Sequence, residues 1–287
     1  MIKKAIIPVA GFGTRFLPAS KAQPKEMLPV VDKPIIQYIV EEAVASGIEE
    51  IIFITGQNKR AIEDHFDSNF ELEHLLENKN QEDVLEEIQR ISSLAKFAYV
   101  RQKKPRGDGD AIRQAAHLVG DEPCAVLFGD DIVLSEKPCL RQLIDIFEKY
   151  QKSVIAVQKV PKEIISRYGV IGGTEIENRV WEVRRVVEKP KPEEAPSDLA
   201  IIGKYIITPE VFDILLRMNN TENQEELRLA HAFQKMLPKQ PLYALEFEGK
   251  RFDCGTKIGL LMANVEFGLK HPDTKKEFSE FLKRKQI

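Results

Sequence analysis

Residues 11–29 read GFGTRFLPASKAQPKEMLP and follow directly on the apolar run Ala5-Ile6-Ile7-Pro8-Val9-Ala10. Two glycines allow the backbone to fold closely around a ligand with its N–H groups pointing inward. Arg15, Lys21 and Lys25 bring three positive charges onto the same short segment. This combination predicts a loop that handles a polyphosphate.

Two well-known phosphate loops do not match this segment. A dinucleotide fingerprint has a third glycine where this chain has Phe16, and a Walker loop needs Gly-Lys-Ser/Thr, which is absent. The segment instead resembles the signature of the sugar-phosphate nucleotidyltransferases. Within them it is similar to the bacterial UTP:glucose-1-phosphate uridylyltransferases, whose loop is followed by Val-Asp-Lys-Pro, as at Val31 to Pro34. The resemblance extends over nearly the whole chain, from about residue 2 to residue 270.

Composition excludes several classes of protein. The chain of 287 residues is just longer than the length at which single cores tend to split. Lys+Arg 42 against Asp+Glu 45 argues against a surface that coats a polyanion, so we expect no nucleic-acid partner. Three scattered cysteines without a Cys-x-x-Cys motif argue against disulfides and structural zinc, and they favour a reducing cytoplasm. No apolar stretch reaches about 18 residues, so we expect no membrane partner.

Strand-like runs alternate with helical patterns through the first half of the chain. Helical spacing of apolar residues predicts a helix over 35–44, ended by Gly47, and a charged helical excursion over 71–96. Such alternation indicates an α/β fold with a mainly parallel sheet and helices on both faces. The predicted strands are 5–9, 50–55, 97–101, 124–128 and 153–158.

The second half is richer in strands, at Val170, 180–187 and 200–207, and these predict an inserted β-rich lobe. Helices are expected over 209–218, 225–236 and 258–269, with a strand at 243–247. The resemblance implies a Rossmann-like, mixed, mainly parallel sheet flanked by helices, as in the nucleotide-diphospho-sugar transferases. We expect one domain over 1–287. Its parts are a nucleotide-binding core (1–160), a sugar-binding lobe with a second metal motif (161–256) and a C-terminal helical segment (257–287).

The reaction that the resemblance implies joins UTP to glucose 1-phosphate and yields UDP-glucose and pyrophosphate. Its nucleophile is a phosphate oxygen that is already ionised at neutral pH, so no general base is required. Such transfers are catalysed by in-line positioning of the reactants and by charge neutralisation from Arg, Lys and Mg²⁺. The lack of a Ser/His/Asp or Cys/His arrangement in the sequence agrees with this chemistry.

The resemblance assigns Arg15 and Lys25 as the catalytic pair that faces the triphosphate and the leaving pyrophosphate. Gln102 and Gly107, in Arg-Gln-Lys-Lys-Pro-Arg-Gly, match the segment that reads the base. A side-chain amide offers an acceptor and a donor group, which can pair with the edge of uracil or thymine. The other residues assigned to the nucleotide are Ala10, Gly11, Gly13 and Glu26.

Two aspartates are the candidate ligands for Mg²⁺. Asp130 follows the apolar run 125–128 at the carboxyl end of a predicted central strand, where open α/β sheets bind ligands. Because Asp-Asp after a strand can equally form a turn or cap a helix, its assignment rests on the resemblance of Leu-Phe-Gly-Asp-Asp to the family's metal segment. Asp253, in Arg-Phe-Asp-Cys-Gly, matches a second family motif and is the candidate for the second metal contact.

The sugar side is assigned to Gly169, Glu188 and Lys189. Lys189 would hold the phosphate of glucose 1-phosphate, Glu188 would bind a sugar hydroxyl, and Gly169 would allow close approach of the sugar. On the residues alone, Glu-Lys-Pro is simply a strand end before a turn. Family members often carry Asn and Arg where this chain has Asp198 and Lys204.

Two segments depart from the family pattern. The first is 107–110, Gly-Asp-Gly-Asp, where Gly-Leu-Gly-His is common, and the second is 224–231, where Gly-Gly-Glu-Ile-Gln-Leu-Thr-Asp is common. Asp108 and Asp110 stand at the start of a helix predicted over 111–118, and we expect Asp110 to cap it. If these carboxylates instead lie beside the nucleotide, Arg106 or Arg113 would have to neutralise them.

These departures leave alternatives to the uridylyltransferase. One is a thymidylyltransferase or a uridylyltransferase for another hexose 1-phosphate, because Gln102 alone cannot distinguish uracil from thymine. The other is a weakly active regulatory paralogue that binds nucleotide sugar. A homodimer or homotetramer would be ordinary for this family.

Overall fold

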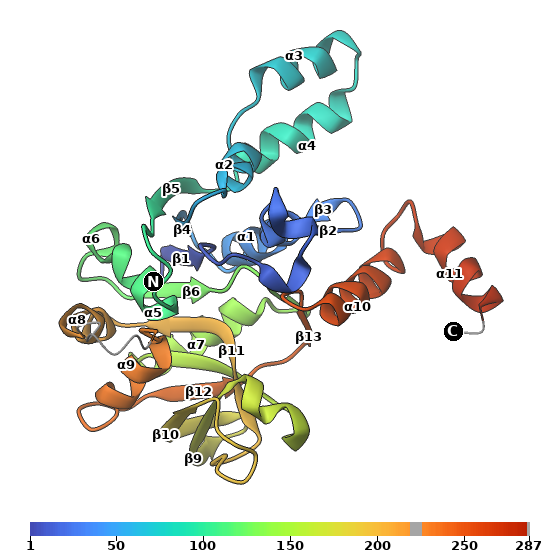
Figure 1. The fold of residues 1–287 in the computed structure, drawn as a ribbon. Coiled ribbons are helices and arrows are strands. Elements are labelled where there is room, and N and C mark those ends of the chain that lie inside the picture. The colour runs from blue at the N-terminus through green and yellow to red at the C-terminus, as the bar shows by residue number, and fades with distance from the viewer. Residues whose placement is uncertain (219–225, 286–287) are drawn as a thin grey trace.

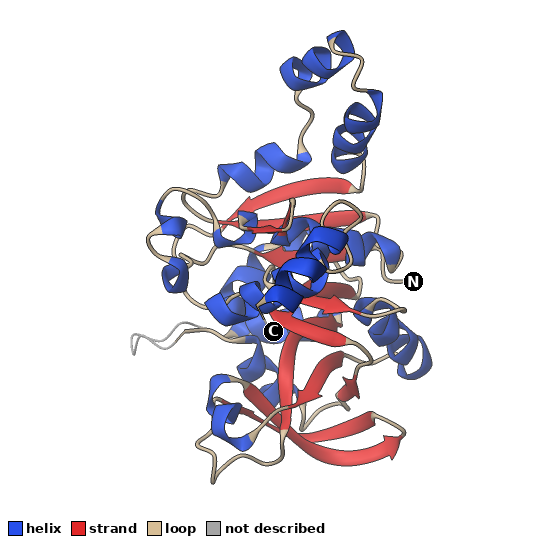
Figure 2. Cartoon of the chain, turned by 90° about the vertical axis from the view of Figure 1, so that its right-hand side faces the viewer, coloured by secondary structure: helices blue, strands red, loops and turns tan. Residues whose placement is uncertain are grey.

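A computed structural model describes residues 1–218 and 226–285 of the chain. Within them, nine strands form one sheet in the order β5-β4-β1-β6-β11-β8-β12-β10-β9. The strands are stacked through the middle of the molecule and helices lie on either side of them (Figure 2). The predicted fold class, a mixed sheet flanked by helices, is therefore confirmed. The sheet is not mainly parallel as predicted, because four of its eight neighbouring strand pairs are parallel and four are antiparallel.

The first half of the sheet is parallel. Strand β1 lies at its centre, with Ala5 opposite Ile51 of β4 on one side and opposite Ala125 of β6 on the other. All four strands were predicted from the sequence to within one residue at each end. They are β1 (Lys4–Pro8), β4 (Glu50–Thr55), β5 (Lys96–Arg101) and β6 (Cys124–Leu127).

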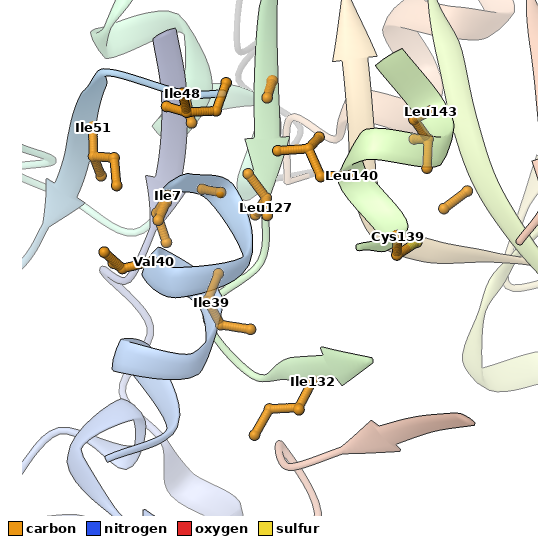
Figure 3. Packing of buried hydrophobic residues seen from close by; sticks show 14 of the residues in the cluster. Ile7, Ile39, Val40, Ile48, Ile51, Leu127, Ile132, Cys139, Leu140 and Leu143 are labelled. Carbon is orange, nitrogen blue, oxygen red and sulfur yellow. The ribbon is translucent and has the colours of Figure 1, made fainter. Parts of the chain in front are cut away.

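Side chains of β1 alternate between the two faces of the sheet, and each face has its own core. Ile7 packs with α1 and α7 in one hydrophobic cluster (Figure 3), whereas Ile6 packs with Ile112 of α5 in the other. The predicted excursion over 71–96 is the helix pair α3 and α4, which extends away from the sheet (Figure 1). The helices of this half are α1 (Ile35–Ala45), α2 (Arg60–Phe66), α3 (Phe70–Asn78), α4 (Glu82–Ser92), α5 (Asp108–Gln114), α6 (Ala116–Val119) and α7 (Cys139–Tyr150).

The second half of the sheet changes direction at β11, which runs antiparallel to both β6 and β8. The two strands of the predicted lobe, β9 and β10, continue the same sheet, because β10 pairs with β12 and β12 pairs with β8. The elements are β8 (Val154–Lys159), β9 (Gly169–Glu177), β10 (Val180–Glu188), β11 (Leu199–Ile207), β12 (Tyr243–Glu246), α8 (Pro209–Arg217) and α9 (Leu229–Met236).

Two helix boundaries differ from the prediction. Helix α9 begins at Leu229 rather than at residue 225, which lies outside the described residues. The residues just before Leu229 are not helical because they are hydrogen-bonded to the start of α5. The N–H of Leu227 donates to Arg106 and its carbonyl accepts from Gly109. The helix predicted over 111–118 instead begins at Asp108 and is interrupted at Ala115, giving α5 and α6.

The sequence did not predict the small sheet of β7 (Asp131–Leu134) and β13 (Lys250–Asp253). These antiparallel strands place Asp131 opposite Asp253, so residues far apart in the sequence meet at the end of β6. The predicted closing helix is α10 (Lys257–Gly268), and α11 (Lys275–Arg284) follows it. Among the described residues, no helix combines the length and the apolar character needed to cross a membrane.

A buried ion pair joins three elements at the centre of the molecule. The Nζ of Lys204 on β11 lies 2.8 Å from a carboxylate oxygen of Glu42 on α1, and the Lys204 side chain is fully buried. The other Glu42 oxygen accepts the N–H of Leu140 at 3.0 Å, in the first turn of α7, where the helix leaves its own N–H groups unpaired. Glu42 therefore connects α1, β11 and α7.

We predict that Lys204→Met lowers the free energy of unfolding by about 3–5 kcal/mol, because it leaves the Glu42 carboxylate buried without a counter-charge. The double variant Lys204→Met/Glu42→Gln removes that charge and keeps an oxygen for Leu140, so it should recover much of the loss. Urea unfolding of both variants measures the difference. Equal destabilisation in the single and the double variant would contradict this account.

Candidate active site

Two adjoining cavities lie at the carboxyl ends of β1 and β6. The first cavity has a volume of about 400 Å³ and the second about 220 Å³, and Asp108 and Phe128 line both. The predicted site residues that line the first cavity are Ala10, Gly11, Gly13, Lys25, Glu26, Gln102, Gly107 and Asp130. Those that line the second cavity are Arg15, Gly169, Glu188, Lys189 and Asp253. The structure thus brings every predicted site residue to one composite cleft.

The glycine-rich loop crosses the mouth of the first cavity in three short 3-10 turns, over Thr14–Phe16, Ala19–Lys21 and Lys25–Met27. Gly13 has a φ of +65°, and a Cβ there would lie 3.1 Å from the Cβ of Lys25, so a side chain would strain the backbone and crowd the loop. The hydroxyl of Ser20 donates to the Gly13 carbonyl at 2.7 Å. The loop is therefore folded back on itself by its own residues.

Lys25 forms an ion pair with Asp130, which ties the loop to the end of β6. Burial alone would raise the pKa of Asp130, but Lys25, with smaller effects of Arg251 and Arg15, holds it below its usual value. Burial opposes the charge on Lys25 as well, yet Asp130 and Glu26 raise its pKa well above the usual value. Both groups are therefore ionised at neutral pH.

Asp130 and Asp253 point to the same place. A side chain at Gly255 would clash with one Asp130 oxygen and lie 3.0 Å from an Asp253 oxygen, so both carboxylates converge in front of this glycine. Burial, followed by the charge of Asp131, raises the pKa of Asp253. Within 1–218 and 226–285 no group of three or more candidate metal ligands occurs. A pair of carboxylates nevertheless fits Mg²⁺, which commonly takes one or two carboxylates and completes its shell with phosphate and water.

The neighbouring Asp131 has a different environment. One of its oxygens accepts from Nε of Arg251 at 2.6 Å, and the other accepts the N–H of Gly203 at 3.0 Å. The Arg251 guanidinium also lies 5.4 Å from the ring centre of Tyr168, and both residues line the second cavity. Asp131 is thus occupied by protein partners on both oxygens. Sequence reasoning missed Arg251, although it stands two residues before Asp253 in the quoted motif.

Glu26 is buried at the back of the first cavity with a partner that the sequence did not suggest. Its carboxylate lies 2.8 Å from Nζ of Lys59, which precedes α2, and both side chains are at most 5% exposed. Burial raises the pKa of Glu26 and Lys59 opposes that rise. Because Lys59 holds one of its oxygens, Glu26 has a fixed orientation in the cavity.

The expectation that Asp110 caps its helix is wrong. The N-cap of α5 is Gly107, with no side-chain cap, and the Asp110 carboxylate is buried between Gln102, at 2.6 Å, and Arg113, at 2.6 Å. Asp108 does accept a helix N–H, but that of Leu229 at 2.7 Å, the first residue of α9. The sequence could not show this, since it does not reveal which neighbouring element supplies the donors.

On the sugar side, Glu188 at the end of β10 is held by Arg228, whose NH1 lies 2.9 Å from Oε1. Arg228 belongs to the departing segment 224–231, of which residues 224 and 225 lie outside the described residues. Lys189 follows with a φ of +47°, and its N–H donates to the Tyr168 carbonyl at 3.0 Å. A Cβ at Gly169 would lie 3.2 Å from Glu188 Oε2, so a larger residue would press on this carboxylate.

Comparison with known proteins agrees with this geometry. The nucleotidyl transferase family model matches residues 4–268. The UTP–glucose-1-phosphate uridylyltransferase of Staphylococcus epidermidis (strain ATCC 35984) is 52% identical over 286 residues, which is 100% of this chain and 99% of that protein.

Solved structures are similar as well. A UDP-glucose pyrophosphorylase complexed with UDP-glucose is 43% identical, with a TM-score of 0.86, over 94% of this chain and 100% of that one. The UTP-bound UGPase of Acinetobacter baumannii is 39% identical, with a TM-score of 0.90, over 98% of this chain and 99% of that one. The chain belongs to the nucleotidyl transferase family, with the uridylyltransferases among its relatives over its full length.

Proposed function

We propose that this enzyme makes UDP-glucose and pyrophosphate from UTP and glucose 1-phosphate. A phosphate oxygen of glucose 1-phosphate attacks the α-phosphorus of UTP, the bond from that phosphorus to the bridging oxygen of the β-phosphate breaks, and pyrophosphate leaves. The observation that carries the proposal is the pair of adjoining cavities, which hold the nucleotide-side and the sugar-side residues separately and meet at Asp108 and Phe128. Relatives of the same fold are known with UTP and with UDP-glucose bound.

Two cationic residues, one on each cavity, support the assignment of this transfer. Lys25 lines the first cavity and Arg15 lines the second, and both lie close enough to Asp130 to lower its pKa. We assign them to the negative charge that accumulates on the phosphates as pyrophosphate departs. Cations held next to the developing charge in a partly enclosed cleft stabilise such charge more than they would in bulk water.

Asp130 and Asp253 are the residues that would hold Mg²⁺. Bound there, the ion would neutralise phosphate charge and align the two phosphate groups. The remaining assignments are to the protein alone. Lys189 supplies a cation for the phosphate of the sugar, and the Glu188 carboxylate, kept in place by Arg228, accepts from a sugar hydroxyl. Ala10, Gly11 and Gly13 contact the nucleotide through their backbone.

We expect purified protein to release pyrophosphate from UTP and glucose 1-phosphate, and to stop when EDTA removes the divalent cation. A coupled pyrophosphatase assay across the four ribonucleotides, dTTP and several hexose 1-phosphates measures both the activity and its selectivity. Excess Mg²⁺ added back after EDTA is the control. Tight UDP-glucose binding without turnover at any Mg²⁺ concentration would favour the regulatory paralogue instead.

Lys25→Ala should lower kcat by about 10² or more, because it removes a charge that faces the transferring phosphate in a partly dry site. Lys21→Ala is the matched control: this residue lies on the same loop but is exposed and lines neither cavity. Its kcat should stay within about twofold of wild type, as usual for exposed charges. Steady-state kinetics at saturating substrates compares them. Similar losses in both variants would show that the loop acts only through its overall charge.

Lys189→Ala should raise KM for glucose 1-phosphate by about tenfold or more and leave KM for UTP nearly unchanged, since one charge-assisted hydrogen bond to phosphate is removed. Lys191→Ala, an exposed lysine two residues further on, provides the control. Kinetics with each substrate varied in turn separates the two constants. A Lys189 variant that loses affinity for UTP but keeps it for the sugar phosphate would reverse the assignment of the cavities.

A further inference from the structure

Gln102 stands immediately after β5, and its side chain uses both of its N–H donors inside the protein. Nε2 donates to Asp110 Oδ2 at 2.6 Å and to the carbonyl of Gly107 at 3.3 Å. The residue is only 6% exposed, and its exposed part belongs to a cavity wall. A primary amide has two N–H bonds, so no further donor remains for a ligand.

Asp110 determines the orientation of the Gln102 amide. An ionised carboxylate only accepts hydrogen bonds, so the nitrogen of Gln102, and not its oxygen, must face it. The second Asp110 oxygen is taken by Arg113, whose other nitrogen donates to the Met218 carbonyl after α8 at 3.1 Å. The carboxylate therefore cannot turn away without leaving the Arg113 guanidinium without its counter-charge.

The opposite end of the Gln102 amide is left for a ligand. Oε1 accepts no hydrogen bond from the described residues, and it is not among the buried unpartnered atoms of that part of the chain. Because the amide cannot rotate, this accessible oxygen can only accept a hydrogen bond from a ligand. Uracil and thymine carry an N–H at N3, whereas cytosine carries a lone pair at the same position, which repels an acceptor.

We propose that Asp110 is a positioning residue which, through Gln102, selects a pyrimidine with N3–H over cytosine. The inference rests on the proposed function for the nucleotide that enters the first cavity. Gln102 contacts the base, and Asp110 acts only by orienting the Gln102 amide. Without Asp110, this amide could rotate and offer its NH₂ group to N3 of cytosine.

The substitution Asp110→Asn tests this directly, because it keeps the shape of the side chain and replaces one oxygen by NH₂. Arg113 needs the remaining oxygen, so the new NH₂ group faces Gln102. Rotation of the Gln102 amide then exchanges the longer contact with the Gly107 carbonyl, at 3.3 Å, for a bond from the new NH₂ group, and presents Nε2 to the cavity. We expect the ratio of kcat/KM for UTP to that for CTP to fall by about tenfold or more, and the ratio of the two affinities likewise.

Two further variants separate positioning from loss of structure. Gln114→Ala removes a hydrogen bond to the backbone carbonyl of Asp110, at 3.3 Å, without touching the carboxylate, and should leave the ratio unchanged. In a Gln102→Leu background, Asp110→Asn should change the ratio no further, since the residue through which it acts is gone. An unchanged ratio in Asp110→Asn, or an equal fall in both backgrounds, would overturn the proposal.

Wild-type protein provides a test that needs no substitution. N3-methyl-UTP lacks the N3–H donor, so it should bind at least about tenfold more weakly than UTP, and equal binding would overturn the proposal. Calorimetric titration with UTP, CTP and N3-methyl-UTP in the absence of sugar phosphate makes this measurement independent of turnover. Selective binding without pyrophosphate release would contradict the proposed function alone, whereas release with unselective binding would contradict only the role of Asp110.

Discussion

The ion pair between Lys25 and Asp130 connects the two parts on which the site depends. Lys25 belongs to a loop whose turns are held mainly by local contacts, and Asp130 lies in the turn between the central strand β6 and β7. Together with the buried pair of Glu26 and Lys59, this contact fixes the end of the loop relative to the sheet. A salt bridge in this position also keeps a cation and an anion charged in a place where burial disfavours both. The cost of burying them is offset only while they remain paired.

Other buried charges follow the same rule of pairing. Glu26 with Lys59, Asp131 with Arg251 and Glu42 with Lys204 each join elements that are distant in the sequence. Such pairs contribute little net stability compared with apolar groups of similar size, but breaking one leaves an isolated buried charge. Their effect is to fix relative positions. In this fold they orient carboxylates and cations around a cleft that must receive two polyanions.

The inner strands of the parallel half, β1, β4 and β6, were predicted well because they are buried on both faces, whereas the edge strand β5 is exposed or half-buried along its length. β4 reads as an almost unbroken apolar run, and its predicted bounds match the structure at both ends. β7 and β13 escaped prediction because β7 begins with Asp131 directly after the short segment that ends β6, and β13 begins with Lys250 and Arg251, so neither follows a turn as a clear apolar run. The partner that buries them lies more than a hundred residues away, and single-sequence patterns carry no information on such pairing.

The residues of the cleft were predicted from motifs, whereas most of their partners were not. Lys59 and Arg251 have no signal in the sequence beyond their charge, since their contacts join different elements of the fold. Arg113 was named as one possible counter-charge, and it pairs with Asp110 within α5. Asp110 shows the physical reason most clearly. An aspartate near a helix start has free N–H groups within reach and normally caps, but here the Gln102 amide and the Arg113 guanidinium each donate to its carboxylate at 2.6 Å. Which donors bind the Asp110 carboxylate depends on how β5, α5 and α8 pack together. Tertiary contacts therefore override the local capping preference of aspartate, in a segment where the chain departs from the family pattern.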